Sequence, residues 1–265
     1  QLKDPRQLYY GTYTMARALT VDYIGPFYDF PFGAWAEPGE RQVLVQPRRK
    51  DGIDVAIERL ESGSVVALTI PTPPEGPPLE QDDEIADLAT RVAARLLKRE
   101  AELRMDGKRR HLAAADIGLC STHRVMNAAM ELKLPKGLRL SSRVDTPERW
   151  QGLECPVMVM AHPLSGVVQP STFDLETGRL CVMASRHQGG LIIVTRDHIG
   201  QTLDDHLPTA EQPIGRPDIA GQGHHKEVRL GPAGHRRQHR FVAPRRIGHQ
   251  VMHRLVRRAH ILRMH

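Results

Sequence analysis

Residues 156–161 (PVMVMA) and residues 191–194 (LIIV) are short apolar runs that flank a longer segment, LETGRLCVMASR, at residues 175–186. Each run has the length and composition of a buried strand, and the segment between them is long enough for a helix. A strand, a helix and a second strand in this order form a βαβ unit, in which the two strands are parallel. These residues therefore predict an α/β fold.

The same alternation continues on both sides of this unit. Further strands are predicted at residues 42–46, 64–70, 117–121 and 138–144, and further helices at residues 84–99, 123–132 and 197–207. Asp82 and Asp83 precede the first of these helices, which they are expected to cap. The alternation predicts a three-layer, mostly parallel sheet whose ligands bind beyond the carboxyl ends of the strands.

The composition excludes several classes of protein. Of 265 residues, 40% are hydrophobic, but no apolar run reaches the roughly 18 residues that a membrane span needs. The first residues contain no secretion signal. Three scattered cysteines, Cys120, Cys155 and Cys181, fit neither a disulfide framework nor a zinc ribbon, and buried thiols are expected instead. We therefore expect a cytoplasmic protein with no metal site of its own and no membrane partner.

The formal net charge of +6 is unevenly distributed along the chain. Residues 222–265 contain 11 of the 37 Lys and Arg residues, 8 of the 14 His residues and a single acid, Glu227. The rest of the chain carries 26 basic and 30 acidic residues and is mildly acidic. We expect this basic tail to be disordered. It is either a nucleic-acid-binding arm, whose binding would weaken with salt, or a frameshift product without a selected role.

Two segments contain residues suited to nucleotide chemistry. In TPERWQGLE, residues 146–154, a turn at Gly152 lets backbone amides approach a phosphate, and the Glu154 carboxylate can accept hydrogen bonds from ribose hydroxyls. In GRLCVMASR, residues 178–186, Arg186 ends an apolar helix before a Gly-Gly turn, where its guanidinium could reach a γ-phosphate. Ordinary structure also explains each segment alone: a capped loop in the first, and an Arg bound to helix C-terminal carbonyls in the second.

Together, and in this order, the two segments resemble a known family. TPERWQGLE followed by a strand resembles the fifth motif of superfamily-one helicases, and GRLCVMASRH followed by LIIV resembles the sixth. Upstream, IGLCSTHR at residues 117–124 is similar to the strand and turn that open the second RecA-like domain of these enzymes. Strings that further resemble a helicase-like AAA family of mostly uncharacterised bacterial proteins are FYDFPFGAWAEPGER (27–41), HPLSG (162–166), FDLETGRLCVMASRH (173–187) and GRPD (215–218).

The resemblance implies a RecA-like fold of the P-loop NTPase type and a role in an ATP-dependent helicase or translocase. Arg186 would be the catalytic arginine finger. The residues that would face the nucleotide are Gln151, Gly152 and Glu154. Thr146 and Arg124 would contact single-stranded nucleic acid, either DNA or RNA. The implied cofactor is ATP with Mg²⁺, bound in the context of a complete first motor domain.

Parts of the motor are missing from this chain. No G-x-x-x-x-G-K-[ST] loop is present to hold phosphates, and no apolar strand ends in Asp-Glu to hold Mg²⁺. The chain does not begin with Met, and KDPRQL at residues 3–8 faintly resembles the end of a first motor domain. We therefore expect the N-terminal motor domain to be missing and this chain alone to be inactive. On this interpretation residues 1–40 are an irregular entry segment, 41–221 the second RecA-like domain and 222–265 the tail.

Four positions depart from the helicase motifs. Pro156 stands where the usual motif has Asp, and Cys181 stands where it has Asn. Gln188 takes the place of an Arg, and Met126 takes the place of a Gln. Nucleotide sensing is compatible with these changes, whereas strand translocation is less so. The alternative function is a non-catalytic module that binds nucleic acid or a protein partner and keeps vestigial helicase motifs.

Two other groups of polar residues could carry chemistry. Asp82, Asp83 and Glu84 could bind a cation, but acids at a helix N-terminus are the ordinary explanation. A hydrolase triad could be formed by His162, Ser165 and Asp174, but no G-x-S-x-G elbow supports it.

Overall fold

The structure is a computed structural model of the 265-residue chain. It describes residues 40–63, 65–78, 80–171, 173–174, 177–205 and 260–263. Most of the predicted entry segment, residues 1–39, and most of the predicted tail lie outside the described residues. The strings at residues 27–39 and 215–218 lie outside them as well, so the expectations placed on these segments stay predictions.

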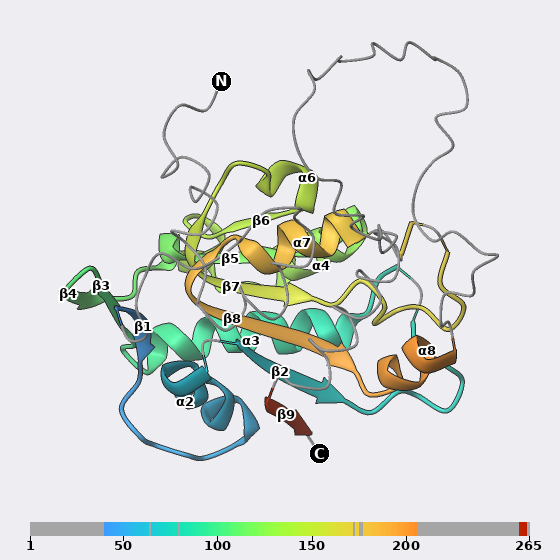
Figure 1. Ribbon diagram of the computed structural model, residues 1–265, viewed down its shortest axis with the longest axis horizontal. Helices are drawn as coiled ribbons and strands as arrows, with labels where there is room; N and C mark the ends of the chain where they lie inside the picture. Colours follow the sequence, from blue (N-terminus) through green and yellow to red (C-terminus); the bar gives the residue numbers. More distant parts are fainter. Residues whose placement is uncertain are drawn as a thin grey trace, which may run out of the picture.

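A parallel sheet with the strand order β6-β5-β7-β8-β2-β9 forms the centre of the molecule (Figure 1). Its strands are β2 (Val65–Ile70), β5 (Ile117–Cys120), β6 (Arg143–Asp145), β7 (Cys155–Ala161), β8 (His187–Arg196) and β9 (His260–Arg263). Every neighbouring pair in the sheet is parallel. The predicted α/β fold with a parallel sheet is confirmed.

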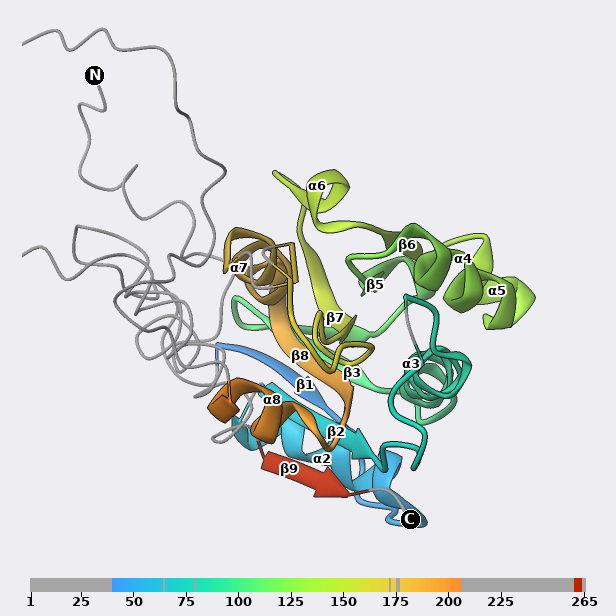
Figure 2. The ribbon, with the colours of Figure 1, turned by 90° about the vertical axis from the view of Figure 1, so that its right-hand side faces the viewer.

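Helices cover both faces of the sheet because both faces are apolar. Val157 and Val159 of β7 belong to one buried cluster, and Met158 and Met160 belong to the other, since successive strand residues point to opposite faces. The first cluster includes residues of α2 (Gly52–Gly63), α3 (Asp83–Lys98) and α4 (Arg124–Lys133), and the second includes residues of α6 (Pro147–Trp150), α7 (Thr177–Ser185) and α8 (Ile199–Asp205). Figure 2 shows α3 and α4 on one side and α7 and α8 on the other.

A small antiparallel sheet with the order β1-β3-β4 lies beside the main sheet. Its strands are β1 (Arg41–Leu44), β3 (Glu102–Met105) and β4 (Lys108–His111). The strand predicted at residues 42–46 therefore exists but belongs to this second sheet. Asp106 and Gly107 form the two-residue hairpin turn between β3 and β4, with φ of 51° and 79°. Helix α2 was not predicted.

Three further expectations differ from the structure. The strand predicted at residues 138–144 is limited to β6, because α5 (Lys136–Arg139) precedes it. The predicted Gly-Gly turn after Arg186 is a part of β8 instead. A Cβ at Gly190 would lie 3.2 Å from Val43 and 3.3 Å from Leu60, so glycine permits β1 and α2 to pack closely against this strand. The prediction of disorder is wrong for His260–Arg263, which pair with β2.

No helix within the described ranges has both the length and the apolar character needed to cross a membrane.

Candidate functional site

The turn at Gly152 and Arg186 meet at one end of the sheet. The turn leads directly into β7, and Arg186 directly precedes β8, the neighbouring strand. The backbone N–H of Cys155 donates a hydrogen bond to the carbonyl of Arg186 at 2.9 Å. Nε2 of Gln188 donates to Oε2 of Glu154 at 3.2 Å, across a separation of 34 positions in the sequence. The two segments that carry the predicted nucleotide contacts therefore lie side by side.

The edge at which they meet is not the predicted one. Both segments precede their strands, so they lie at the amino-terminal edge of the sheet, and the expectation of a carboxyl-edge site is wrong for them. The general rule places ligands beyond the carboxyl ends of parallel strands, where the loops that follow the strands gather. Residues that lead into a strand lie at the opposite edge.

The turn itself is open to a ligand. Gly152 has φ of +80°, a left-handed conformation that favours glycine, and the space around a Cβ at this position is empty to 4 Å. Residues 151–154 are exposed. The turn is anchored by Trp150, which is 2% exposed and donates from Nε1 to the carbonyl of Leu119 at 3.2 Å. The exposed backbone of the turn is therefore held in place by the buried side chain of Trp150.

The guanidinium of Arg186 has no partner within the described ranges. Its Nε is enclosed by neighbouring atoms, and no acceptor in the described part of the chain binds it. No ion pair and no hydrogen bond to the carbonyls at the end of α7 satisfies this side chain there, so the ordinary explanation of a helix-capping Arg is not supported. The positive charge of Arg186 therefore has no counter-charge in the described part of the chain.

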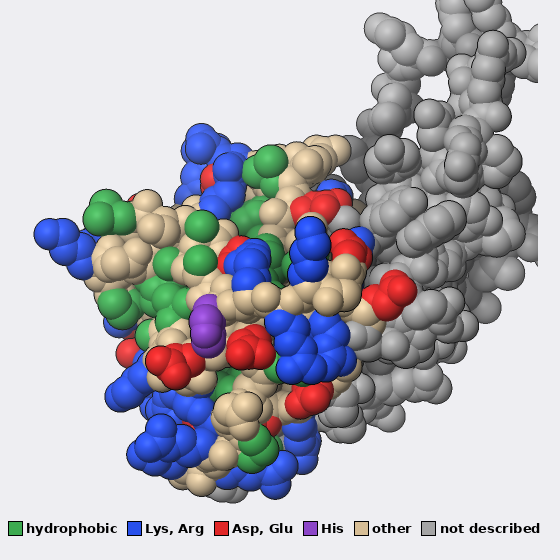
Figure 3. Space-filling view, turned by 90° about the vertical axis from the view of Figure 1, so that its left-hand side faces the viewer, with side chains coloured by type: hydrophobic (Ala, Val, Ile, Leu, Met, Phe, Trp, Pro, Cys, Tyr) green, Lys and Arg blue, Asp and Glu red, His purple; other side chains and the backbone are tan. Residues whose placement is uncertain are grey.

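The surface at the amino-terminal edge carries mixed charge. Figure 3 shows this side of the molecule, with Lys and Arg side chains interspersed among Asp and Glu side chains. Interspersed charges of opposite sign largely cancel in the field that the described part of this face projects.

The predicted nucleic-acid contacts lie at the carboxyl-terminal edge. Arg124 is exposed and begins α4 directly after β5 and its loop, and Thr146 follows β6, the strand next to β5. Thr146 is only 9% exposed, and its carbonyl accepts hydrogen bonds from the N–H groups of Arg149 and Trp150 at 3.0 and 3.1 Å. Both residues thus follow neighbouring strands, at the edge opposite Arg186.

The hydrolase triad considered from the sequence does not form. The Ser165 hydroxyl pairs with that of Thr195 at 2.9 Å, and the Asp174 carboxylate accepts from the Ser171 hydroxyl at 2.7 Å. His162 is buried, and its Nδ1 accepts from the N–H of Leu164 at 3.2 Å. None of the three side chains bonds to another, so this interpretation is wrong.

The acids at the start of α3 hold an arginine. Asp82 caps the helix, as predicted, by accepting from the N–H groups of Glu84 and Ile85, both at 3.1 Å, whereas Asp83, also predicted to cap it, is the first residue of the helix. Arg196, at the end of β8, donates to Asp82 at 2.8 Å and to Glu84 at 2.6 Å. Within the described ranges no group of three or more His, Cys, Asp or Glu residues could hold a metal ion.

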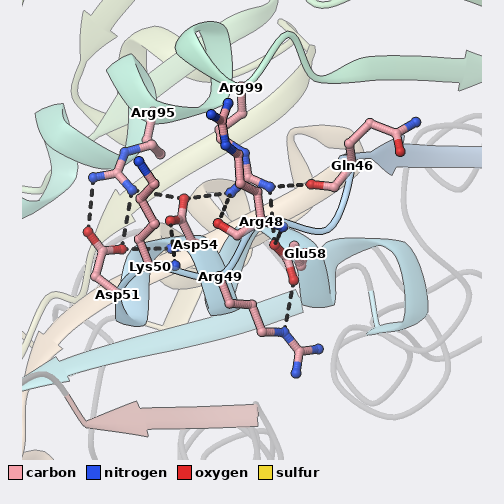
Figure 4. Close-up of polar contacts among 9 residues, drawn as sticks. All are labelled: Gln46, Arg48, Arg49, Lys50, Asp51, Asp54, Glu58, Arg95 and Arg99. Atoms are coloured by element: carbon pink, nitrogen blue, oxygen red, sulfur yellow. Dashed lines mark hydrogen bonds and ion pairs between the residues drawn. The ribbon is translucent and has the colours of Figure 1, made fainter.

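The densest group of charges joins α2 to α3 and was not predicted (Figure 4). Arg95 of α3 binds Asp51 at 2.9 Å and Asp54 at 2.8 Å, and Arg99 binds Asp54 at 2.6 Å and Glu58 at 3.1 Å. Each carboxylate has a basic partner. Burial raises the pKa of Asp54, but hydrogen bonds from Arg95 and Arg99 outweigh it and lower that pKa. This α2–α3 charge cluster is therefore structural.

Neither a protein-family model nor a curated protein sequence matches this chain. The resemblance to superfamily-one helicases rests on the motifs alone.

Proposed function

We propose that this chain is the second RecA-like motor domain of a superfamily-one helicase-like ATPase. The meeting of the Gly152 turn with Arg186 carries the proposal, because two segments that resemble consecutive helicase motifs lie side by side at one end of the sheet. A parallel sheet with helices on both faces is compatible with a RecA-like arrangement.

In this proposal the nucleotide is held by the phosphate-binding loop of another domain and docks against the amino-terminal edge. The Glu154 carboxylate accepts hydrogen bonds from ribose hydroxyls, and the backbone of Gln151 and Gly152 borders the phosphates. Arg186 places its unpaired guanidinium on the γ-phosphate, where it stabilises transition-state charge. ATP supplies the phosphoryl group, and Mg²⁺ belongs to the other domain, since the described residues form no acidic cluster for it.

The proposed contacts with nucleic acid lie at the carboxyl-terminal edge of the sheet. Arg124 and Thr146 follow β5 and β6, so they would hold a nucleic-acid backbone at the edge opposite the nucleotide. β5 and β7 run between the two edges as rigid elements. A movement of this domain relative to the nucleotide would therefore be transmitted to the bound nucleic-acid strand.

The first test is the activity of the chain alone. We expect no measurable magnesium-dependent ATP hydrolysis in a steady-state assay, because no phosphate-binding loop is present. Robust turnover by the purified chain would contradict the proposal.

The second test restores a first motor domain by fusion to one from a superfamily-one enzyme. Arg186→Ala should lower kcat by about a thousandfold or more, as removal of an arginine finger does. Arg91→Ala is the matched control, because Arg91 is exposed and pairs only with Asp87 among charged neighbours on α3. Equal activity of the two variants would favour the alternative below.

The alternative is a non-catalytic module that binds nucleic acid or a protein partner. One observation favours it: Gln188, which replaces an Arg of the helicase motif, donates to Glu154 and occupies one oxygen of the carboxylate that would bind ribose.

A further inference from the structure

A polar contact joins α6 to α7. Nε of Arg179, in the first turn of α7, donates a hydrogen bond to Oε1 of Glu148 in α6 at 2.8 Å. The two residues are 31 positions apart, and they come from the two segments that resemble consecutive helicase motifs. These segments are therefore connected a second time, away from the place where Gly152 and Arg186 meet.

Arg179 is held in this position by Phe173. Its Nη1 donates to the carbonyl of Phe173 at 3.3 Å, and its Cζ lies 3.8 Å from the centroid of the Phe173 ring, a distance at which cation–π attraction acts. The side chain of Arg179 is 21% exposed and that of Glu148 is 57% exposed. Ion pairs this open to solvent contribute little to folding, so removal of this pair should leave the fold intact.

Glu148 also contacts the segment proposed to bind nucleic acid. Thr146 is the N-cap residue of α6, and α6 is fixed to the sheet by the buried Trp150. Burial raises the pKa of Glu148, but hydrogen bonds from Arg179, from its own backbone N–H and from the Thr146 side chain outweigh it and lower that pKa. The Glu148 carboxylate therefore has Thr146 on one side and Arg179 on the other.

Helix α7 connects this contact to Arg186. The helix runs back from the carboxyl ends of the strands towards their amino ends and stops directly before Arg186 (Figure 1). Its nine residues span about 14 Å at 1.5 Å per residue. Leu180, Met183 and Ala184 are buried against the sheet, so a displacement at the Arg179 end is carried along a packed, continuous element.

We propose that Arg179 is a positioning residue that transmits nucleic-acid binding at Thr146 to the guanidinium of Arg186. A strand phosphate that takes the hydrogen bond of the Thr146 hydroxyl leaves the Glu148 carboxylate to Arg179, and this strengthens the attachment of α7 to α6. The inference rests on the proposed function, because the roles of Thr146 and Arg186 belong to it. Arg179 itself touches neither the nucleotide nor the strand.

The first test uses the full chain and follows the ¹⁵N resonance of the enclosed Nε of Arg186 while a single-stranded oligonucleotide is added. We expect this resonance to shift in the wild type and to stay in place in Arg179→Gln and in Glu148→Gln, each of which removes the ion pair. Arg179→Lys keeps the charge and should restore part of the shift. Arg91→Gln removes an exposed ion pair within α3 and is the control, which should shift as the wild type does.

The second test measures ATP hydrolysis by the fusion with a first motor domain, with and without the oligonucleotide. Arg179→Gln should lower the stimulation by the oligonucleotide about fivefold or more, since couplings of this size are typical between two sites. Hydrolysis without the oligonucleotide should change by less than about twofold, because Arg179 touches neither ligand.

Three results would overturn the inference: no shift of the Arg186 resonance in the wild type, an equal shift in Arg179→Gln, or full stimulation of the Arg179→Gln fusion. Failure of the proposed function has a different signature, which is full hydrolysis by the Arg186→Ala fusion. Loss of hydrolysis in Arg186→Ala together with full stimulation in Arg179→Gln would reject the role of Arg179 alone.

Discussion

At the scale of single residues, Gly118 determines how closely Trp150 can approach the sheet. A Cβ at Gly118 would lie 2.5 Å from Cη2 of Trp150 and 2.9 Å from Sγ of Cys155. The indole therefore lies directly against the backbone of β5. This contact allows the chain to pass from β6 over β5 and to enter the Gly152 turn from a fixed position.

We predict that Gly118→Ala lowers the free energy of unfolding by about 1–3 kcal/mol, because the rigid indole has to move. Gly178→Ala is the matched control: a Cβ at that helical position meets nothing within 4 Å, so the change should be neutral or stabilise by up to about 1 kcal/mol. Urea denaturation of the two variants measures both effects. A loss of stability of the same size in both would show that the indole does not require the glycine.

The sequence predicted the residues of the candidate site from their chemistry, but it did not predict which side chains surround them. The TPERWQGLE and GRLCVMASR strings pointed to Gly152 and Arg186. Nothing in the sequence indicated that Gln188 would bind Glu154, since this contact exists only because β7 and β8 are neighbours. His162 was noted for the wrong reason, and its free Nε2 became visible only from its burial.

At the scale of elements, α2 and α3 are joined by their charge cluster. Asp54 is 1% exposed and receives hydrogen bonds from Arg95 of α3 and from Arg99, which follows the last residue of this helix. Removal of one partner from a buried ion pair leaves the other partners charged in a poorly solvated place. The cluster therefore stabilises the packing of two helices that cover the same face of the sheet.

We predict that Asp54→Asn lowers the free energy of unfolding by about 1–3 kcal/mol at pH 7, because Arg95 keeps Asp51 and Arg99 keeps Glu58 as partners. Asp87→Asn should change it by less than about 1 kcal/mol, because Asp87 and Arg91 form an exposed pair within α3. Guanidinium chloride denaturation compares the two, and an equally small effect at Asp54 would contradict the structural role of the cluster. The pKa of Asp54 is lowered in the folded state, so its contribution is present at neutral pH and is lost as the pH falls through that pKa.

At the scale of the whole molecule, two buried histidines link folding to pH. Burial lowers the pKa of His162 to about 3, with a smaller effect of His198, and burial lowers the pKa of His187 to about 4. An unfolded histidine has a pKa of about 6.5. The unfolded chain therefore takes up protons below about pH 6.5 that the folded chain does not.

We predict that the free energy of unfolding decreases as the pH is lowered from about 6.5 towards 4, by up to about 1.4 kcal/mol per pH unit for each of these histidines. Denaturant titrations at pH 7, 6 and 5 measure this slope. His187→Phe should reduce the slope, whereas His111→Gln, at an exposed position, should leave it unchanged. An unchanged slope in His187→Phe would show that this ring is protonated in the folded protein.

The sequence by itself determined the α/β class and most of the strands and helices of the main sheet. β7 and β8 read as continuous apolar runs because parallel strands are buried on both faces, and this pattern is local. The tertiary structure alone decided the order of the strands, the edge at which Gly152 and Arg186 meet, and the inclusion of Gly189 and Gly190 in β8. These depend on contacts between residues far apart in the chain, such as Gly190 with Val43 and Leu60, which local spacing does not encode.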